Sequence, residues 1–319
     1  MDFRILHSNI RGFTSKKESL EEIVLKIRPS AVCLNETGLK GKNKVKLEGY
    51  FSFCKNRLEK AMGGVSTSVA NDLKPSAVRI KESDDGDEYL ITRFDHCLPP
   101  INVIAIYGMQ ESREGKDKVL KSWYGLKKDL DVIKLRGEGC LLIGDLNRKI
   151  GNDQWGVKGN HSEVSMGGQL LRDLFASEDY ALINNSDKCV GGPFTREEPG
   201  DKDNKSCLDL AIASVNLLPF IMSMEIDSKW EFTPLRAVSR GKGKGLRVIH
   251  ADHYPFVLEL VGLPARKQSL ERQVKWNLNK PGGWKAYADM SEDMAGKIED
   301  IFGLDDRNID EVFRKMDKI

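Results

Sequence analysis

The sequence predicts an α/β fold in which two mainly antiparallel β-sheets pack face to face with helices outside them, a four-layer α/β sandwich. Three features support this prediction. A strand, an amphipathic helix and a second strand open the chain, and five strand-like runs follow between residues 50 and 107. A second block of strands and helices extends from about residue 116 to residue 261. Two such blocks bury their apolar faces best against each other and beneath helices.

The first elements are predicted to form a β-α-β unit. Residues 3–9 read as a buried strand that stops at Asn9. Ser15, with Glu18 three residues later, has the pattern of a capping box, and apolar residues at helical spacing predict an amphipathic helix over 16–28. A second strand over 31–34 leads into Asn35 and Glu36. If the two strands are neighbours, Asn9 and Glu36 lie at the same edge of a sheet.

Strands and helices are predicted along the chain as far as residue 261. Strands are expected at 50–55, 63–70, 76–81, 88–94, 101–107, 141–143, 181–184, 206–213 and 254–261, and helices at 116–134 and 167–178. The composition changes after Gly262 to a polar, linker-like stretch. Residues 1–262 are therefore predicted to form one domain, and residues 263–319 a helical extension that is too short to have its own core.

Composition excludes several classes of protein. The 319 residues carry a formal net charge of +2, so any surface for nucleic acid is a local patch. The six cysteines occur singly, without a CxxC pair or a histidine at zinc spacing, which favours reduced core residues. No apolar run reaches the ~18 residues of a membrane span, and the first residues do not resemble a signal peptide. We expect a soluble, non-secreted protein of the nucleus or cytoplasm.

Polar side chains end many of the predicted strands. They are Asn9, Glu36, Tyr107, Asp145, Asn147, Ser206, Asp209, Asp252 and His253. Each alone is explained by a turn that it caps or by an ordinary place in the core. Together they place carboxylates, amides and one histidine at strand ends, where open α/β sheets bind ligands. Such a set around a divalent metal is what a phosphate-ester hydrolase needs.

Seven short motifs carry a resemblance to a known family. They are Ser8-Asn9-Ile10-Arg11-Gly12, Asn35-Glu36-Thr37, Gly63-Gly64-Val65, Ile106-Tyr107-Gly108, Gly144-Asp145-Leu146-Asn147, Ser206-x-x-Asp209 and Ala251-Asp252-His253-Tyr254-Pro255. Over residues 1 to about 262 the chain resembles the endonuclease/exonuclease/phosphatase superfamily of metal-dependent phosphodiesterases. Within it, the chain resembles the apurinic-endonuclease-like domains of non-LTR (LINE-type) retrotransposon polyproteins. Asn35 and Ala251 depart from the Gln and Ser that are frequent there, and neither change removes a titrating group.

The resemblance implies a DNase I-like fold, a catalytic domain over 1–262 and a role for each motif residue. Glu36, Asn9 and Asp252 would serve a Mg²⁺ ion, with Mn²⁺ as the alternative. Asp145 would orient or deprotonate the attacking water, and Asn147 would hold that water or the phosphate. Asp209 would bond His253, whose imidazolium stabilises the transition state. Tyr107 would donate to a phosphate oxygen.

Two charged segments bear on the substrate. The loop over 195–205 corresponds to a hairpin that probes a DNA groove in the retrotransposon domains, and the run over 236–247 carries five cations without an acid. A solvated turn or loop is the alternative explanation of each. The residues expected to contact DNA are Arg11, Thr195, Arg196, Lys202, Asn204, Ser206, Arg240, Lys242, Lys244 and Arg247.

The leading hypothesis is a Mg²⁺-dependent DNA endonuclease that nicks double-stranded DNA and leaves a 3′-hydroxyl. By resemblance, this end would prime reverse transcription of an element RNA by a reverse transcriptase of the same polyprotein, to which residues 263–319 would lead. Two alternatives stay open. The same site could act on another phosphoester in repair, RNA or inositol phosphate metabolism, or the chain could be a non-catalytic module that docks on nucleic acid.

Overall fold

The computed structural model describes residues 2–57, 63–83, 86–152, 163–198, 201–239, 246–250 and 252–264. The predicted extension over 263–319 lies outside these ranges except for its first two residues. Leu263 is buried in the core between the sheets. Within the described ranges, no helix has the length and apolar character that crossing a membrane requires.

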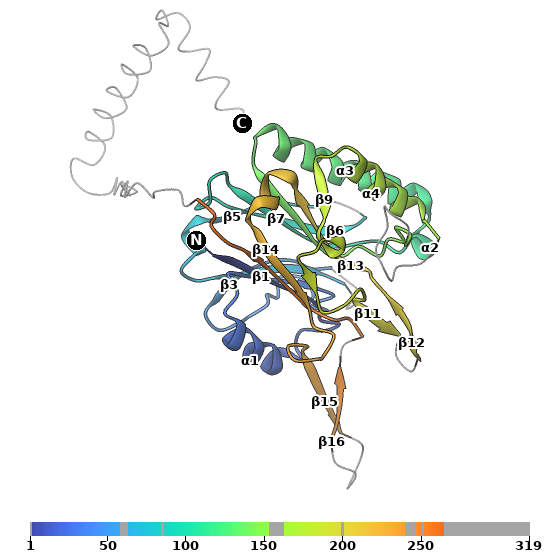
Figure 1. Cartoon of the computed structure of the whole chain (residues 1–319). Helices are drawn as coiled ribbons and strands as arrows, with labels where there is room; N and C mark the ends of the chain where they lie inside the picture. The colour runs from blue at the N-terminus through green and yellow to red at the C-terminus, as the bar shows by residue number, and fades with distance from the viewer. Residues whose placement is uncertain are drawn as a thin grey trace, which may run out of the picture. The chain divides into compact units, whose positions relative to one another are not determined.

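A seven-stranded mixed sheet forms the layer that packs against helix α1 (Lys17–Ile27) (Figure 1). Its strand order is β10-β14-β17-β1-β2-β4-β3. The strands are β1 Phe3–Asn9, β2 Ala31–Asn35, β3 Tyr50–Lys55, β4 Val65–Ala70, β10 Cys189–Val190, β14 Ile221–Ile226 and β17 Phe256–Leu260. Strands β1 and β2 run parallel, as the β-α-β start predicts, and β17 runs antiparallel on the other side of β1.

A six-stranded sheet forms the second strand layer, in the order β5-β6-β7-β8-β13-β9. Its strands are β5 Ala77–Glu82, β6 Glu88–Phe94, β7 Ile101–Tyr107, β8 Gly139–Asp145, β9 Tyr180–Leu182 and β13 Asp209–Ser214. The outer helices are α2 Glu111–Glu114, α3 Lys116–Leu135 and α4 Met166–Ala176. Figure 1 shows α3 and α4 on the side of this sheet away from α1.

Shorter elements complete the described chain. Two hairpins lie outside the main sheets: β11 Arg196–Glu198 with β12 Asp201–Ser206, and β15 Leu235–Ser239 with β16 Leu246–His250. Figure 1 shows both hairpins extending away from the two sheets. Three 3₁₀ helices occur at Lys74–Ser76, Ile183–Asn185 and Val215–Phe220.

Alternation along β1 explains the layers. Phe3 and Ile5 belong to the apolar core between the two sheets, whereas Leu6 packs in the separate core beneath α1. A third core joins the outer face of the six-stranded sheet to α3 and α4 and contains Trp123 and Leu142. Successive side chains of a strand point to opposite faces, so both faces of each sheet are buried here. The predicted four-layer α/β sandwich is confirmed.

Three local predictions were wrong. The single strand expected over 206–213 is divided, because β12 ends at Ser206 and β13 begins at Asp209 in another sheet. Ser15 does not cap α1: its hydroxyl donates to the carbonyl of Gly12 at 3.3 Å, and the helix follows Lys16 without a side-chain cap. The strand expected over 181–184 ends at Leu182, because the chain turns into a 3₁₀ helix that carries Asn184 across to β13. There the Asn184 amide bonds the backbone of Asp209 and Ala211.

A buried ion pair fixes the loop that follows β7. Arg148 Nη2 donates to both carboxylate oxygens of Asp87 at 2.9 Å, and Arg148 Nη1 donates to the carbonyl of Met109 at 2.6 Å. The Met109 N–H in turn donates to Asp87 Oδ1 at 2.6 Å. Both charged side chains are buried. The network therefore holds the residues after Tyr107 next to the end of β8.

We expect Arg148→Ala to lower the free energy of unfolding by roughly 3–5 kcal/mol, because it leaves the Asp87 carboxylate buried without its partner. Urea denaturation measures this loss. Lys149→Ala is the matched control, since the Lys149 side chain is exposed and its pair with Glu163 is long at 3.4 Å; that variant should lose ~1 kcal/mol at most. Equal losses for the two variants would contradict the role of the buried pair.

Candidate active site

Strand register brings the predicted polar residues to one edge of the two sheets. Asn9 pairs with Asn35 in the parallel ladder of β1 and β2. Asp145 is the partner of Tyr107 in the parallel ladder of β7 and β8, and of Asp209 in the antiparallel ladder of β8 and β13. These strands end or begin at the same level. Their terminal side chains therefore meet, although they come from distant parts of the chain.

Asn9 bridges two carboxylates. Its Nδ2 donates to Glu36 Oε1 and to Asp145 Oδ2, both at 3.0 Å. Asn9 is 1% exposed, Asp145 2% and Glu36 8%, so all three lie below the surface. Asn9 Oδ1 is buried and has no hydrogen-bond partner among the described residues. The amide donor thus lies where a cation would be favoured, and the same residue has an unused oxygen ligand.

The backbone around Glu36 is unusual for its residue type. Glu36 has φ of 50°, in the left-handed region that side chains other than glycine seldom adopt. The Gly12 N–H donates to the Glu36 carbonyl at 2.8 Å, which holds this conformation against the turn after β1. Strain that surrounding bonds maintain is frequent at functional sites. Here it turns the Glu36 side chain toward Asn9.

Asn35 holds the backbone of Asp145, and Asn147 holds its carboxylate. Asn35 Nδ2 donates to the carbonyl of Ile106 at 2.7 Å, and Asn35 Oδ1 accepts from the Asp145 N–H at 3.2 Å. Asn147, with φ of 49°, donates its N–H to Asp145 Oδ1 at 3.1 Å and its Nδ2 to the Gly108 carbonyl at 2.9 Å. The Asn35 side chain therefore joins the two sheets at the site.

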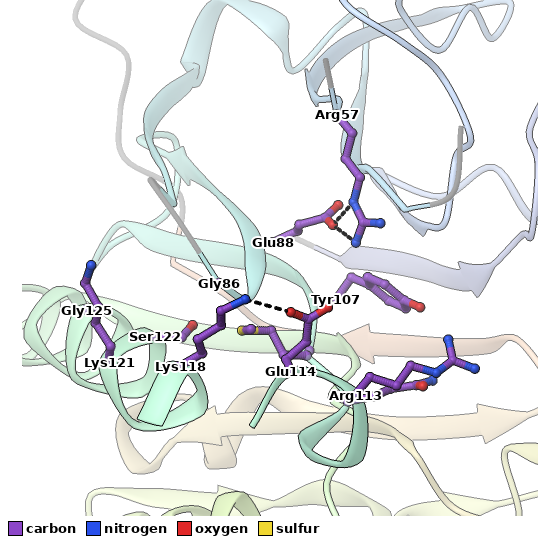
Figure 2. Close-up of a pocket in the computed structure, with 13 residues that line it drawn as sticks. Arg57, Gly86, Glu88, Tyr107, Arg113, Glu114, Lys118, Lys121, Ser122 and Gly125 are labelled. Carbon is purple, nitrogen blue, oxygen red and sulfur yellow. Dashed lines mark hydrogen bonds and ion pairs between the residues drawn. The ribbon is translucent and has the colours of Figure 1, made fainter. Parts of the chain in front are cut away.

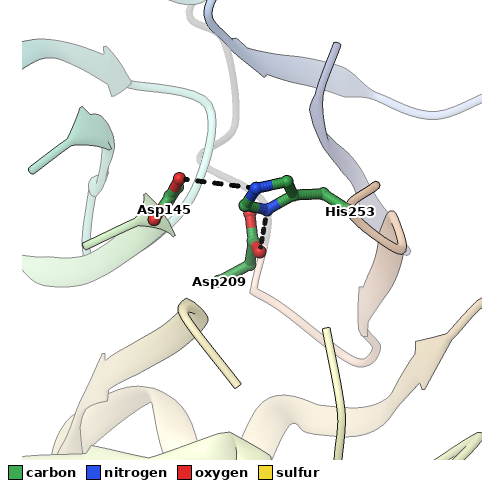
Figure 3. A group of neighbouring side chains, drawn as sticks. All are labelled: Asp145, Asp209 and His253. Carbon is green, nitrogen blue, oxygen red and sulfur yellow. Dashed lines mark hydrogen bonds and ion pairs between the residues drawn. The ribbon is translucent and has the colours of Figure 1, made fainter. Parts of the chain in front are cut away.

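A second group consists of Asp145, Asp209 and His253 (Figure 3). Asp209 Oδ2 lies 2.7 Å from His253 Nδ1, and Asp145 Oδ2 lies 3.9 Å from His253 Nε2. The first distance is a hydrogen bond and the second is too long for one. One potential metal-ligand atom of each residue lies within 4.8 Å of those of the other two, so this group also has the composition of a possible metal site. Asp145 belongs to both groups.

The charges of this group are strongly coupled. Burial, followed by the charge of Asp209, raises the pKa of Asp145 to about 7. For His253, burial favours the neutral ring, but the charge and hydrogen bond of Asp209 outweigh it and raise the pKa to about 9. Burial acts against ionisation of Asp209 too, yet the charge of His253 and the bonds from His253 and His7 hold its pKa below the usual range. The favoured state at neutral pH is an imidazolium bonded to a carboxylate.

Tyr107 and Asp252 differ in their relation to these groups. Burial, followed by the charges of Glu36 and Asp145, raises the pKa of Tyr107, which keeps its phenol protonated as a donor. Asp252 was expected to serve a metal. Its Oδ2 accepts from Arg11 Nη1 at 2.6 Å, and Arg196 Nε lies 3.8 Å from the same oxygen, whereas its buried Oδ1 has no hydrogen-bond partner among the described residues. Its partner here is thus a guanidinium.

The residues expected to contact DNA divide into three sets. Arg11, Arg196 and Asn204 have partly or fully exposed side chains. Thr195 and Ser206 are buried, at 0% and 3% exposed, and are therefore inaccessible to DNA in this conformation. Lys202 and Arg247 lie in β12 and β16, but their side chains fall outside the described part of the chain, as do Arg240, Lys242 and Lys244 entirely.

The hairpin β11–β12 is bonded to the segments that carry Asp209 and His253. Thr195 Oγ1 accepts from the N–H groups of Leu208 and Asp209 at 3.0 and 2.9 Å. The Tyr254 N–H donates to the Thr195 carbonyl at 2.7 Å, and the Glu197 N–H to the Asp252 carbonyl at 2.8 Å. The base of the hairpin therefore fixes the backbone on both sides of His253.

Sequence reasoning missed three residues that hold the site: His7, Asn35 as a bridge between sheets, and Asn184. His7 lies two residues before Asn9, so the alternation of a strand already placed both on one face. Nothing in the sequence indicated that the partners of His7 and Asn35 would come from the other sheet.

A cavity of about 810 Å³ adjoins the site at Tyr107 (Figure 2). Its lining includes four cations and two carboxylates: Arg57, Arg113, Lys118, Lys121, Glu88 and Glu114. Glu88 pairs with Arg57, and Glu114 pairs with Lys118 at 3.2 Å. The cavity lies beside the carboxylates rather than over them, and Tyr107 is the site residue in its lining.

The sequence matches the family described as "Endonuclease/Exonuclease/phosphatase family" over residues 6–218. A search of curated protein sequences found no match to the chain.

Solved structures with a similar fold include nucleases of several kinds. The AP endonuclease LMAP from Leishmania major has a TM-score of 0.62 at 14% identity, with 81% of this chain and 87% of that chain covered. The endonuclease domain of TRAS1, a telomere-specific non-LTR retrotransposon, has a TM-score of 0.52 at 14% identity, with 82% and 98% covered. The 3′-5′ exonuclease NExo from Neisseria meningitidis has a TM-score of 0.59 at 14% identity, with 81% and 99% covered. At these identities the likeness is one of fold.

The raised pKa of His253 predicts a loss of stability as pH increases. An unfolded histidine titrates near 6.5, so the folded state binds the extra proton between about pH 6.5 and 9. The contribution is fully present below pH 6.5 and disappears as pH rises through 9. In metal-free buffer we expect the free energy of unfolding to fall by roughly 2 kcal/mol between pH 7 and 8.5.

Urea denaturation of the wild type and of His253→Gln at both pH values measures this contribution. The variant retains the other titrating side chains, so it should show a much flatter dependence. An equally steep dependence in both proteins would mean that His253 is not held as an imidazolium.

Proposed function

We propose that this chain, which belongs to the endonuclease/exonuclease/phosphatase family, is a divalent-metal-dependent endonuclease that hydrolyses a phosphodiester bond of double-stranded DNA and leaves a 3′-hydroxyl. One observation carries the proposal. Asn9 bonds the carboxylates of Glu36 and Asp145. The other side of Asp145 faces His253, which is bonded to Asp209, so Asp145 lies between the two groups where the sheet edges meet. A group that favours a cation thus lies next to a proton acceptor and a charged proton donor.

Glu36 and Asn9 would hold the metal ion, with Asp145 beside it. The donor set fits Mg²⁺ or Mn²⁺, since it offers carboxylate oxygens and the unused Oδ1 of Asn9. When bound, the ion would supply positive charge against a phosphate oxygen. Asp252 is placed outside this set, because its carboxylate is paired through Oδ2 with Arg11 and has no hydrogen bond to Asn9 or Glu36, although its Oδ1 has no partner among the described residues. Asp209 is not included either, because its bond to His253 is short and buried.

The protein groups around Asp145 suit hydrolysis near neutral pH. A carboxylate with a pKa of about 7 can accept a proton from water at the operating pH, and Asn147 fixes its orientation. His253 Nε2 faces Asp145 at 3.9 Å, which is too long for a hydrogen bond. Its proton is therefore available to stabilise the negative charge that develops on the phosphate oxygens. The protonated phenol of Tyr107 is a further donor at the same edge.

Features around the site support a nucleic-acid substrate. The exposed Arg11 and the partly exposed Arg196 lie next to His253 through Asp252. The hairpin β11–β12 extends from the same edge, and the cavity beside Tyr107 adds Arg113 and Lys121. Guanidinium and ammonium groups provide the contacts by which proteins hold a phosphate backbone. The fold likeness to the TRAS1 endonuclease domain supports a role in target-site nicking for a retrotransposon, with the 3′-hydroxyl as primer for reverse transcription.

A second candidate is removal of nucleotides or phosphate from a 3′ end, since NExo is described as a 3′-5′ exonuclease. Two assays separate the candidates. Supercoiled plasmid is incubated with the purified chain and Mg²⁺, and the nick is extended by a DNA polymerase, which requires a 3′-hydroxyl. Release of phosphate or nucleotides from a 3′-phosphorylated oligonucleotide without plasmid nicking would favour the second candidate.

Asp145→Asn should lower the nicking rate by at least ~10²-fold while preserving the fold, because it removes the proton acceptor shared by both groups. Initial rates on supercoiled plasmid measure the effect, and circular dichroism checks the fold. Asp131→Asn is the control, since Asp131 is an exposed carboxylate of α3 that pairs with Lys127. Nicking by Asp145→Asn at the rate of the control would overturn the assignment.

Glu36→Gln and Asn9→Ala should each raise the Mg²⁺ concentration for half-maximal nicking by ~10-fold or more, because each removes an oxygen ligand or its support. Isothermal titration calorimetry with Mn²⁺ measures the same loss without turnover. Asp252→Asn should leave Mn²⁺ affinity close to that of the wild type. If Asp252→Asn lowers the Mn²⁺ affinity as much as Glu36→Gln does, the metal lies next to Asp252 and the proposed ligand set is wrong.

A further inference from the structure

Asp209 has a second histidine partner. His7 Nε2 lies 3.0 Å from Asp209 Oδ1, while His253 Nδ1 lies 2.7 Å from Asp209 Oδ2. The side chains of His7 and Asp209 are both 0% exposed. Each oxygen of one buried carboxylate thus has its own imidazole, in the order His7–Asp209–His253.

The position of His7 in the fold makes this contact a bridge between layers. His7 is the partner of Phe256 in β17 and of Cys33 in β2, so it lies in the middle of the seven-stranded sheet. Asp209 begins β13 in the other sheet. The His7 ring packs on Phe256 with the ring centroids 4.7 Å apart. Asn9 and His7 therefore lie on the same face of β1, where Asn9 bonds Glu36 and Asp145 and His7 bonds Asp209.

The geometry assigns the tautomer of His7. Asp209 Oδ1 is an acceptor, so the proton lies on Nε2. The other ring nitrogen, Nδ1, is buried without a hydrogen-bond partner among the described residues, and a proton there would be unsatisfied. The hydrogen bond of the His7 ring is therefore directed at Asp209 alone among the described residues.

We propose that His7 is a positioning residue for the reaction: it holds the Asp209 carboxylate so that Oδ2 faces His253 and both carboxylate oxygens are reserved for imidazoles. The Asp209 backbone is already fixed by Thr195 and Asn184, but the carboxylate can still rotate about its side-chain bonds. A donor on Oδ1 removes that freedom. An apolar residue at position 7 would fill the space and leave Oδ1 buried without this donor.

His7→Leu and His7→Gln separate positioning from packing. His7→Leu should lower kcat for nicking by about tenfold with little change in KM, and His7→Gln, whose amide can donate, should recover most of the loss. The half-saturating Mg²⁺ concentration should stay unchanged in both, because Asp209 is not a metal ligand. In the Asp209→Asn background, His7→Leu should have almost no further effect on kcat, since His7 acts through that carboxylate.

His96→Leu is the matched control. His96 is also buried, with Nδ1 2.9 Å from Ser76 Oγ and Nε2 without a partner among the described residues, but it lies away from the site. It should lose stability and keep kcat. If His7→Leu behaves like His96→Leu, or if its effect on kcat simply adds to that of Asp209→Asn, His7 is only a core residue and the proposal fails.

Nuclear magnetic resonance of ¹⁵N-histidine-labelled protein tests the contact without turnover. The chain has five histidines, so the ring signals can be assigned with the variants above. His7 should be the Nε2–H tautomer, and the hydrogen-bonded Nδ1 proton of His253 should shift in His7→Leu and return in His7→Gln. Absence of a proton on His7 Nε2 would overturn the proposal, even if His7→Leu failed to fold.

The kinetic part rests on the proposed function, and the two can fail separately. A wild-type chain that nicks no DNA, with the expected tautomer and the expected shift of the His253 signal, would refute the proposed reaction and support the arrangement around Asp209. A chain that nicks DNA, with a His253 signal indifferent to His7, would refute only the positioning role.

Discussion

The structure depends on the burial of three carboxylates at one sheet edge. Glu36, Asp145 and Asp209 are all buried, and they interact through the low dielectric of the protein interior. Such a group is unfavourable unless each charge has a donor or a cation. The surrounding polar residues meet this need in different ways: an amide for Glu36 and Asp145, and two imidazoles for Asp209. Glu36 and Asp145 share the single amide donor of Asn9, and the negative charge that this donor does not offset favours a metal ion there.

This constraint also explains why the site joins both sheets. Glu36 follows β2 of the seven-stranded sheet, whereas Asp145 and Asp209 lie in neighbouring strands of the six-stranded sheet and accept hydrogen bonds from Asn9 and His7 of the other sheet. Asn9 of β1 reaches Asp145 of β8, and Asn35 of β2 reaches the backbone of β7 and β8. The geometry of the site therefore depends on how the two sheets pack against each other. A shift of one residue in the β1–β2 register would turn Asn9 to the opposite face.

The sequence could predict residues that end strands, because strand ends are a local property. Alternating and apolar runs located Asn9, Glu36, Tyr107, Asp145 and Asp209 at strand ends, and the structure brings these side chains together. Contacts between sheets could not be predicted in this way, since they depend on how two distant strands face each other. For that reason the contact of His7 with Asp209 was missed.

Short elements were missed for a related physical reason. The hairpin strand β11 and the two-residue strand β10 bury too little apolar surface to show a clear pattern of their own. Their stability comes from bonds to neighbours, such as the backbone bonds between the β11 hairpin and residues 252–254. The burial of Thr195 illustrates the difficulty: its sequence context is a charged loop, whereas its hydroxyl caps the start of β13.

The base of the hairpin β11–β12 is bonded to the segments on both sides of the His253–Asp209 pair. Thr195 bonds the backbone of Asp209 on one side and of Tyr254 on the other, and Arg196 pairs with His253 in an isolated β-bridge. The hairpin is therefore joined to the backbone around Asp209 and His253 by direct hydrogen bonds. With His7 holding the opposite side of Asp209, the His253–Asp209 pair is fixed both by the sheets and by the hairpin. Groups fixed in this way need little reorganisation when charge develops on a substrate, which is the physical basis of electrostatic catalysis.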